Sequence, residues 1–89
     1  MTFSEFGRRV QQNASNGTDH GTANNLFLIG EQLQKPGFFN AAPDLSKLDN
    51  GDLIYQVDFR NIYATILDRW LDSSVPQVLG ENFDRLNLV

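Results

Sequence analysis

The sequence predicts an α/β or α+β chain with two to four short strands and one main helix near its C-terminal end. Residues 26–29 form an apolar run closed by Gly30, as in a strand that is buried on both faces. Residues 58–71 carry apolar side chains at the spacing of one helical face. One helix of this length cannot cover both faces of a sheet. We therefore expect residues 1–89 to be a single small domain or the C-terminal fragment of a larger α/β domain.

The first part of the chain alternates between strand, loop and turn signals. Residues 1–6 are expected to form a short strand or the end of one. Residues 10–25 are rich in Asn, Gln, Ser and Gly and poor in apolar side chains, which predicts a long loop. Residues 38–39 are a candidate edge strand. Asn50-Gly51 favours a type I′ turn, so residues 45–57 are expected to form a hairpin.

The main helix is expected over residues 58–71, where seven apolar residues line one face: Phe59, Ile62, Tyr63, Ile66, Leu67, Trp70 and Leu71. Asp58 suits the N-cap, because its carboxylate can accept hydrogen bonds from the first free backbone N–H groups. Pro76 suits the first turn of a second short helix over residues 75–79, which Gly80 ends. An apolar tail then needs a surface to lie against: Phe83, Leu86 and Leu88.

Composition and charge argue against several classes of protein. Seven basic and eleven acidic residues give a net charge of −4, whereas a nucleic-acid-binding surface needs a basic stripe. The sequence has no cysteine, which excludes disulfides and thiolate metal sites. No apolar run approaches the length of a membrane span, and the first residues do not have the pattern of a signal peptide. As written, the chain is expected to remain in the cytoplasm.

Two short stretches carry candidate chemistry. In Gly17-Thr18-Asp19-His20-Gly21, His20 can bind a metal or move a proton, and Asp19 can be a second ligand or fix the histidine tautomer. In Ser4-Glu5-Phe6-Gly7-Arg8, Glu5 ends the expected strand, where α/β sheets place their ligands, and Arg8 can contact an anion. Taken alone, each stretch is more simply explained by a solvated loop or by surface charges.

Taken together, these stretches resemble the C-terminal end of a bacterial family. The family comprises large, uncharacterised, sulfatase-like proteins that typically carry a twin-arginine export signal, and it belongs to the alkaline phosphatase and sulfatase superfamily. The resemblance covers nearly all of the chain and implies the C-terminal part of an alkaline-phosphatase-like domain. It is carried by the order of five stretches: Ser4-Glu5-Phe6-Gly7-Arg8, Gly17-Thr18-Asp19-His20-Gly21, Leu26–Gly30, Asp58-Phe59-Arg60-Asn61-Ile62-Tyr63 and Trp70-Leu71.

The resemblance implies a partial metal site. In that superfamily a central strand ends in an Asp-His-Gly turn, and a later His-Gly turn supplies another ligand. Here Glu5 stands in place of the aspartate, Phe6 stands in place of the first histidine, and His20-Gly21 matches the later turn. In the alternative alignment Asp19-His20-Gly21 is the first turn, and Asp19 and His20 are both ligands. The implied metal is a divalent ion such as zinc or calcium, with Arg8 as an anion contact.

The superfamily's nucleophile and remaining metal ligands lie in N-terminal and middle parts of the domain that this sequence does not contain. Since a metal needs about four ligands, we expect the isolated chain to be catalytically inactive and to bind no metal tightly. Complete relatives would be exported, metal-dependent hydrolases of phosphate or sulfate esters, and the missing N-terminal portion is then the expected partner. The alternative is a small binding or scaffold domain without catalysis that self-associates through its uncovered strand and residues 83–89.

Overall fold

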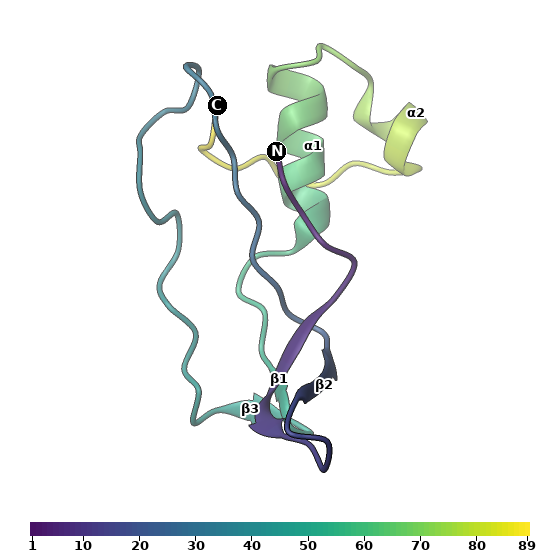
Figure 1. Cartoon of the computed structure of the whole chain (residues 1–89). Coiled ribbons are helices and arrows are strands. Elements are labelled where there is room, and N and C mark those ends of the chain that lie inside the picture. The colour runs from purple at the N-terminus through teal and green to yellow at the C-terminus, as the bar shows by residue number, and fades with distance from the viewer. The chain divides into compact units, whose positions relative to one another are not determined.

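The structure is a computed structural model that describes all residues, 1–89, and it combines strands with helices (Figure 1). The four strands form two separate antiparallel sheets of two strands each, β1-β2 and β3-β4. The predicted α+β class, with short strands and one main helix near the C-terminal end, is therefore confirmed. The elements in chain order are β1 (Gly7–Gln12), β2 (Thr18–Gly21), β3 (Leu48–Asp49), β4 (Asp52–Leu53), α1 (Phe59–Arg69) and α2 (Val75–Leu79).

The chain divides into two compact units. Unit 1 comprises Met1–Ile29 and Ala41–Gln56, and unit 2 comprises Gly30–Asn40 and Val57–Val89. All four strands belong to unit 1, and both helices belong to unit 2. Neither helix has the length and apolar character that a membrane-spanning helix requires.

The hairpin β1-β2 lies where the sequence predicts a loop. Residues 10–25 contain the end of β1 and all of β2, so the predicted loop is wrong. The turn between the strands is closed by Asn13, whose N–H donates to the carbonyl oxygen of Gly17 (2.8 Å). The Asn13 side-chain oxygen also accepts from the N–H groups of Ser15 (2.9 Å) and Gly17 (3.0 Å). An amide side chain therefore supplies the bonds that tighten this turn, and no apolar periodicity is needed.

Three expected strands are absent. Residues 1–6 and the apolar run at residues 26–29 contribute only one bridge, in which Thr2 and Phe27 exchange hydrogen bonds of 2.8 and 3.1 Å. Phe27 is 61% exposed and Ile29 is 86% exposed, so the prediction of a strand buried on both faces is wrong. The expected edge strand at residues 38–39 is also wrong. With only two strands in each sheet, no layered sheet exists in which the run at residues 26–29 could be buried.

The hairpin at Asn50-Gly51 is confirmed, although its strands have only two residues each. Both turn residues have positive φ angles, 49° for Asn50 and 85° for Gly51, as a type I′ turn requires. The guanidinium of Arg9 in β1 donates to the carbonyl oxygen of Asn50, and its Nε lies 3.3 Å from Oδ1 of Asp52. A Cβ on Gly51 would lie 2.9 Å from Cζ of Arg9. Glycine at this position therefore permits both the turn and the contact that joins the two hairpins.

Both helices of unit 2 begin and end close to the predicted residues. Asp58 is the N-cap of α1, where its Oδ1 accepts from the N–H of Arg60 (2.9 Å) and its Oδ2 lies 2.7 Å from the Arg60 guanidinium. These bonds hold the pKa of Asp58 below its ordinary value. α2 begins with Pro76 in its first turn and ends at Gly80, whose φ is 87°.

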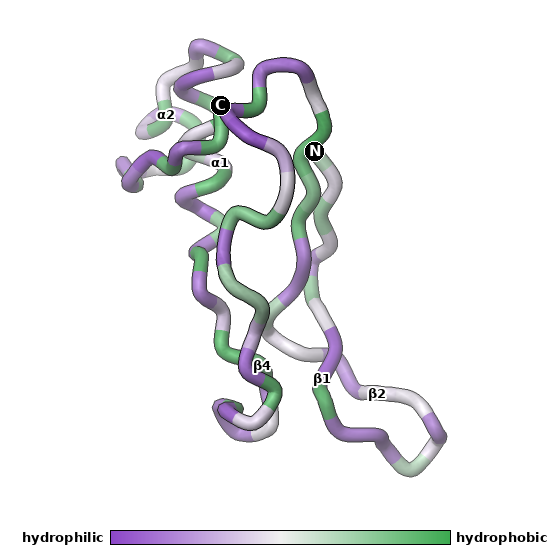
Figure 2. The backbone as a smooth tube through the Cα atoms, turned by 90° about the vertical axis from the view of Figure 1, so that its left-hand side faces the viewer, coloured by the Kyte–Doolittle hydropathy of each residue, from purple (hydrophilic) through white to green (hydrophobic).

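The hydrophobic core is small and belongs to unit 2. The buried apolar side chains are those of Ala64, Ile66 and Val75, and Thr65 is buried among them as a polar residue. Unit 1 buries no apolar side chain, and Figure 2 shows its β1-β2 hairpin largely in hydrophilic and neutral colours. Main-chain pairing and polar contacts therefore hold unit 1 together with half-buried leucines, and only unit 2 buries apolar side chains fully.

Candidate functional site

The two stretches with candidate chemistry meet in the β1-β2 hairpin of unit 1. Gly7 pairs with Gly21 and Arg8 pairs with His20, before a bulge shifts the register toward Gln12. Residues directly opposite each other in an antiparallel pair place their side chains on the same face of the sheet. The side chains of Arg8 and His20 are therefore neighbours on one face of the hairpin.

Two glycines allow the close approach of these stretches. Gly7 and Gly21 are both buried. A Cβ on Gly7 would overlap the carbonyl oxygen of Ala23 and lie 2.8 Å from its carbonyl carbon. A Cβ on Gly21 would lie 2.9 Å from the carbonyl carbon of Arg8. Since all of these neighbours are main-chain atoms, a side chain at either position would force the strands or the segment beside them to move.

His20 is exposed on β2, and its ring is stacked on Phe6. The two ring centroids are 3.8 Å apart and the ring planes differ by 22°. This stack covers one face of the imidazole and fixes its tilt. The lone pair of a neutral imidazole lies in the ring plane, so the stack leaves the chemistry of the ring edge unobstructed. Phe6 therefore orients the histidine without competing for its nitrogen atoms.

Arg8 and Asp19 each make a local hydrogen bond. Nη1 of Arg8 donates to the carbonyl oxygen of Thr18 (2.9 Å), which holds the guanidinium against β2. Oδ1 of Asp19 accepts from Nδ2 of Asn13 (3.0 Å), which ties the carboxylate to the hairpin turn. Since successive residues of a strand point to opposite faces, Asp19 and His20 face away from each other on β2. Arg8 and His20 are thus grouped on one face, and Asp19 belongs to the other.

Glu5 is exposed and precedes β1 by two residues. Nowhere in the structure do three His, Asp or Glu side chains gather closely enough to hold a metal ion. Glu5, Asp19 and His20 therefore form no ligand set, and the residues present do not fit a complete metal centre. What the hairpin does present is one imidazole beside one guanidinium, a pair that suits an oxyanion.

Sequence reasoning identified Arg8 and His20 but missed that they are cross-strand neighbours, and it missed the stack of His20 on Phe6. One signal for the hairpin was present in the sequence. Asn16-Gly17 lies between the two strands, and an Asn-Gly pair favours the tight turn of a hairpin.

A family model described as "Protein of unknown function (DUF1501)" matches residues 1–74. The matched range contains the β1-β2 hairpin with Arg8 and His20, the second hairpin and α1. Comparison with curated proteins and with solved structures gives no match.

Proposed function

We propose that this chain, which belongs to the DUF1501 family of proteins of unknown function, is the C-terminal portion of a sulfatase-like or alkaline-phosphatase-like protein. In this proposal the β1-β2 hairpin supplies one wall of a site for a phosphate or sulfate ester. One observation supports the proposal above the others: the pairing of Arg8 with His20 brings together two stretches that the resemblance assigns to one site. In this proposal the nucleophile and the remaining metal ligands of the superfamily belong to residues outside this chain, so the chain alone is catalytically inactive.

The face that carries Arg8 and His20 suits the oxyanion of such an ester. The guanidinium is charged at every physiological pH and presents its donors in a plane that fits two oxygen atoms. His20 adds a ring edge that can donate a proton or serve as one ligand of a divalent cation. The other ligands of that cation would come from residues outside this hairpin.

This proposal can be tested by titrating the full chain with inorganic phosphate or sulfate and following its amide and histidine NMR signals. We expect saturable shifts at Arg8 and His20, with a dissociation constant on the order of millimolar, because few groups contact the anion. Arg8→Gln should abolish these shifts. Lys35→Gln, which removes an exposed charge from unit 2, should leave them unchanged. Shifts spread evenly over all basic residues would contradict a site on this face.

Two further measurements address the claim that the chain is one portion of a larger site. Aryl phosphate and aryl sulfate hydrolysis by the purified chain should not exceed the buffer rate, and added zinc should not bind stoichiometrically at micromolar concentration. Hydrolysis above the buffer rate, or stoichiometric binding of zinc, would contradict the proposal. The proposal also predicts that the DNA immediately upstream of Met1 encodes a continuation of the domain, in frame or frameshifted, with a twin-arginine leader farther upstream.

A second candidate function is a self-associating binding or scaffold domain. It is favoured by the imbalance between three buried apolar side chains and fifteen large hydrophobic residues that are exposed, among them Phe3, Phe27, Phe38 and Trp70. Light scattering after gel filtration separates the two candidates. A folded monomer that does not aggregate argues against self-association, whereas a stable dimer without anion binding argues against the hairpin site.

A further inference from the structure

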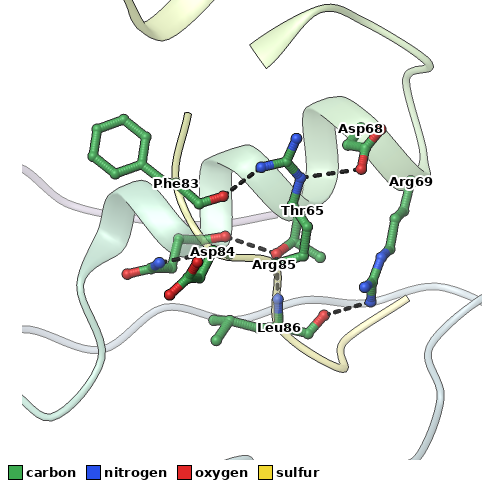
Figure 3. A network of polar contacts seen from close by, with 8 residues as sticks. Thr65, Asp68, Arg69, Phe83, Asp84, Arg85 and Leu86 are labelled. Atoms are coloured by element: carbon green, nitrogen blue, oxygen red, sulfur yellow. Dashed lines mark hydrogen bonds and ion pairs between the residues drawn. The ribbon is translucent and has the colours of Figure 1, made fainter. Parts of the chain in front are cut away.

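Residues 83–88, called the strap from here on, lie along α1 in unit 2 (Figure 3). Nδ2 of Asn61 donates to the carbonyl oxygen of Asp84 (3.0 Å). The N–H of Leu86 donates to Oγ1 of Thr65 (2.8 Å). Nη1 of Arg69 donates to the carbonyl oxygen of Leu86 (2.9 Å). The helix therefore holds the strap through the strap's main chain.

The three helix residues, called the receptor row, are spaced four residues apart: Asn61, Thr65 and Arg69. That spacing places them one above another on one face of α1. Asn61 contacts Asp84, whereas Thr65 and Arg69 both contact Leu86, so the row binds two alternate residues of the strap. After Leu86 the strap turns, and the N–H of Leu88 donates to the carbonyl oxygen of Leu86 (2.9 Å). These three side chains contact only main-chain N–H and C=O groups of the strap, and such groups are present in peptides of almost any sequence. The receptor row can therefore bind an extended peptide segment largely irrespective of its sequence.

Side chains add selectivity to this main-chain recognition. Nε of Arg85 lies 3.0 Å from Oδ2 of Asp68. The guanidinium of Arg60 lies over the ring of Phe83, 5.0 Å from its centroid. A segment that occupies the receptor row equally well should therefore carry an aromatic residue and, two positions later, a basic residue. The chain's own residues 83–88 have this pattern.

The centre of the receptor row is closed to solvent. Thr65 is fully buried, and its hydroxyl donates to the carbonyl oxygen of Asn61 (2.7 Å) while it accepts from Leu86. No buried side-chain nitrogen or oxygen in the structure is left without a partner. The far end of the strap is held by Gln34, whose N–H donates to the carbonyl oxygen of Leu88 (2.9 Å). Removing the strap would thus expose Thr65 and break a continuous row of polar contacts.

We propose that the strap is a releasable intramolecular ligand of α1, and that the receptor row binds the strap of a second copy of this chain when its own strap is displaced. Every contact described above is available to an identical segment from another copy, so the exchange requires no new surface. α1 lies within the residues that the family model matches, and the strap lies beyond them. Tethering gives the chain's own strap an effective concentration on the order of millimolar, so the closed monomer is the ground state.

Hydrogen exchange of the full wild-type chain tests whether the strap opens separately from the helix. The Leu86 amide should exchange at least about tenfold faster than the Ile66 amide of α1, because a local opening that releases the strap requires less free energy than unfolding the helix. Equal protection of the two amides under all conditions would mean that strap and helix open as one unit, and it would overturn the proposal.

Binding of a second strap is tested with a fluorescein-labelled peptide of residues 83–89 and full-length variants. Leu86→Pro removes the N–H group that donates a hydrogen bond to Oγ1 of Thr65, and so releases the chain's own strap. The peptide should bind this variant at least about tenfold more tightly than it binds the wild type. With Thr65→Val added, binding should weaken about fivefold, whereas Thr65→Ser should preserve it.

Circular dichroism reports whether α1 remains helical in the Leu86→Pro variant. A helical variant that does not bind the peptide would overturn the proposal, as would a wild-type chain that binds the peptide equally well. Loss of the helix in the variant would also overturn it, because a releasable strap leaves α1 folded.

Discussion

Replacing Gly7 with alanine should separate β1 from the segment after β2 and thereby disrupt the pairing of Arg8 with His20. The Cβ of the new residue would overlap the carbonyl oxygen of Ala23, and it would lie 2.8 Å from the Ala23 carbonyl carbon and 3.3 Å from Cα of Asn24. All three neighbours are main-chain atoms. No flexible side chain can move aside to relieve the overlap.

The expected loss of stability follows from this geometry. Ordinary van der Waals contact begins at 3.4 Å, so the Ala23 carbonyl carbon must retreat by about 0.6 Å, and its oxygen must retreat farther. Overpacking of this kind costs about 1–3 kcal/mol. A two-stranded hairpin is only marginally stable in water, and unit 1 buries no apolar side chain that could compensate. A loss of this size is therefore sufficient to open the hairpin near Gly7.

NMR spectroscopy of the full chain measures the effect directly. Gly7→Ala should remove the cross-strand nuclear Overhauser effects between Arg8 and His20 and the ring-current shift that Phe6 imposes on His20. Gly17→Ala is the matched control, because a Cβ there would meet nothing closer than the Asn13 side chain at 3.8 Å. The argument from close approach would be refuted if Gly7→Ala retained the cross-strand signals and if its free energy of unfolding lay within about 0.5 kcal/mol of the wild-type value.

Three further substitutions probe other parts of the chain. Thr65→Val should lower the free energy of unfolding by about 1–3 kcal/mol, because it leaves a strap N–H without its acceptor, and Thr65→Ser should lose little in the same thermal denaturation. Asp58→Ala should cost about 0.5–2 kcal/mol through loss of the N-cap. Because Arg60 lowers the pKa of Asp58 in the folded chain, this contribution is present above the ordinary carboxyl pKa of about 3.9 and is lost as the pH falls through the folded value. A pH titration of helicity should therefore show an acid loss in the wild type that Asp58→Ala lacks. Gly51→Ala should disrupt the second hairpin, because its φ of 85° is strained for alanine and its Cβ would meet the Arg9 guanidinium; unchanged β3-β4 signals would contradict this.

The helices were predictable from the sequence because their determinants are local. Each determinant lies within the helix that it defines or next to it. For α1 these are the apolar spacing over residues 58–71 and the carboxylate of Asp58, and for α2 it is Gly80 at the C-cap. The same holds for the turn at Asn50-Gly51, where two positive φ angles require these residue types. Elements of this kind need no knowledge of what packs against them.

The remaining elements depend on contacts between residues that are distant in the sequence. The sequence predicts that residues 26–29 are buried. Such burial requires a sheet that is covered on both faces, and an apolar run does not show whether the covering elements exist. The β1-β2 hairpin was missed because its turn is closed by the Asn13 side chain and its base by the paired glycines Gly7 and Gly21. Neither feature produces a hydrophobic pattern.

The candidate site shows the same division. Residue chemistry singled out Glu5, Arg8, Asp19 and His20 as candidates, since a guanidinium can contact an anion and an imidazole or a carboxylate can bind a metal. The proximity of Arg8 and His20 depends on a register that only the structure provides. The opposite orientation of Asp19 follows from the strand that the sequence did not predict. Assigning ligands from a motif therefore requires knowing whether the motif is a turn or a strand.

The position of the site on a weakly stabilised hairpin has a thermodynamic consequence. β1 and β2 are held by main-chain pairing, by the Asn13 turn and by the Arg9 contact, and no apolar side chain of unit 1 is fully buried. A ligand that binds only when Arg8 faces His20 must stabilise the paired state by RT ln(1 + [L]/Kd), which is about 1.4 kcal/mol at a ligand concentration nine times Kd. That amount is comparable with the stability of a two-stranded hairpin. The anion binding proposed for this face is therefore coupled to ordering of the β1-β2 hairpin. If it occurs, phosphate should slow amide exchange in β1 and β2 without affecting exchange in α1.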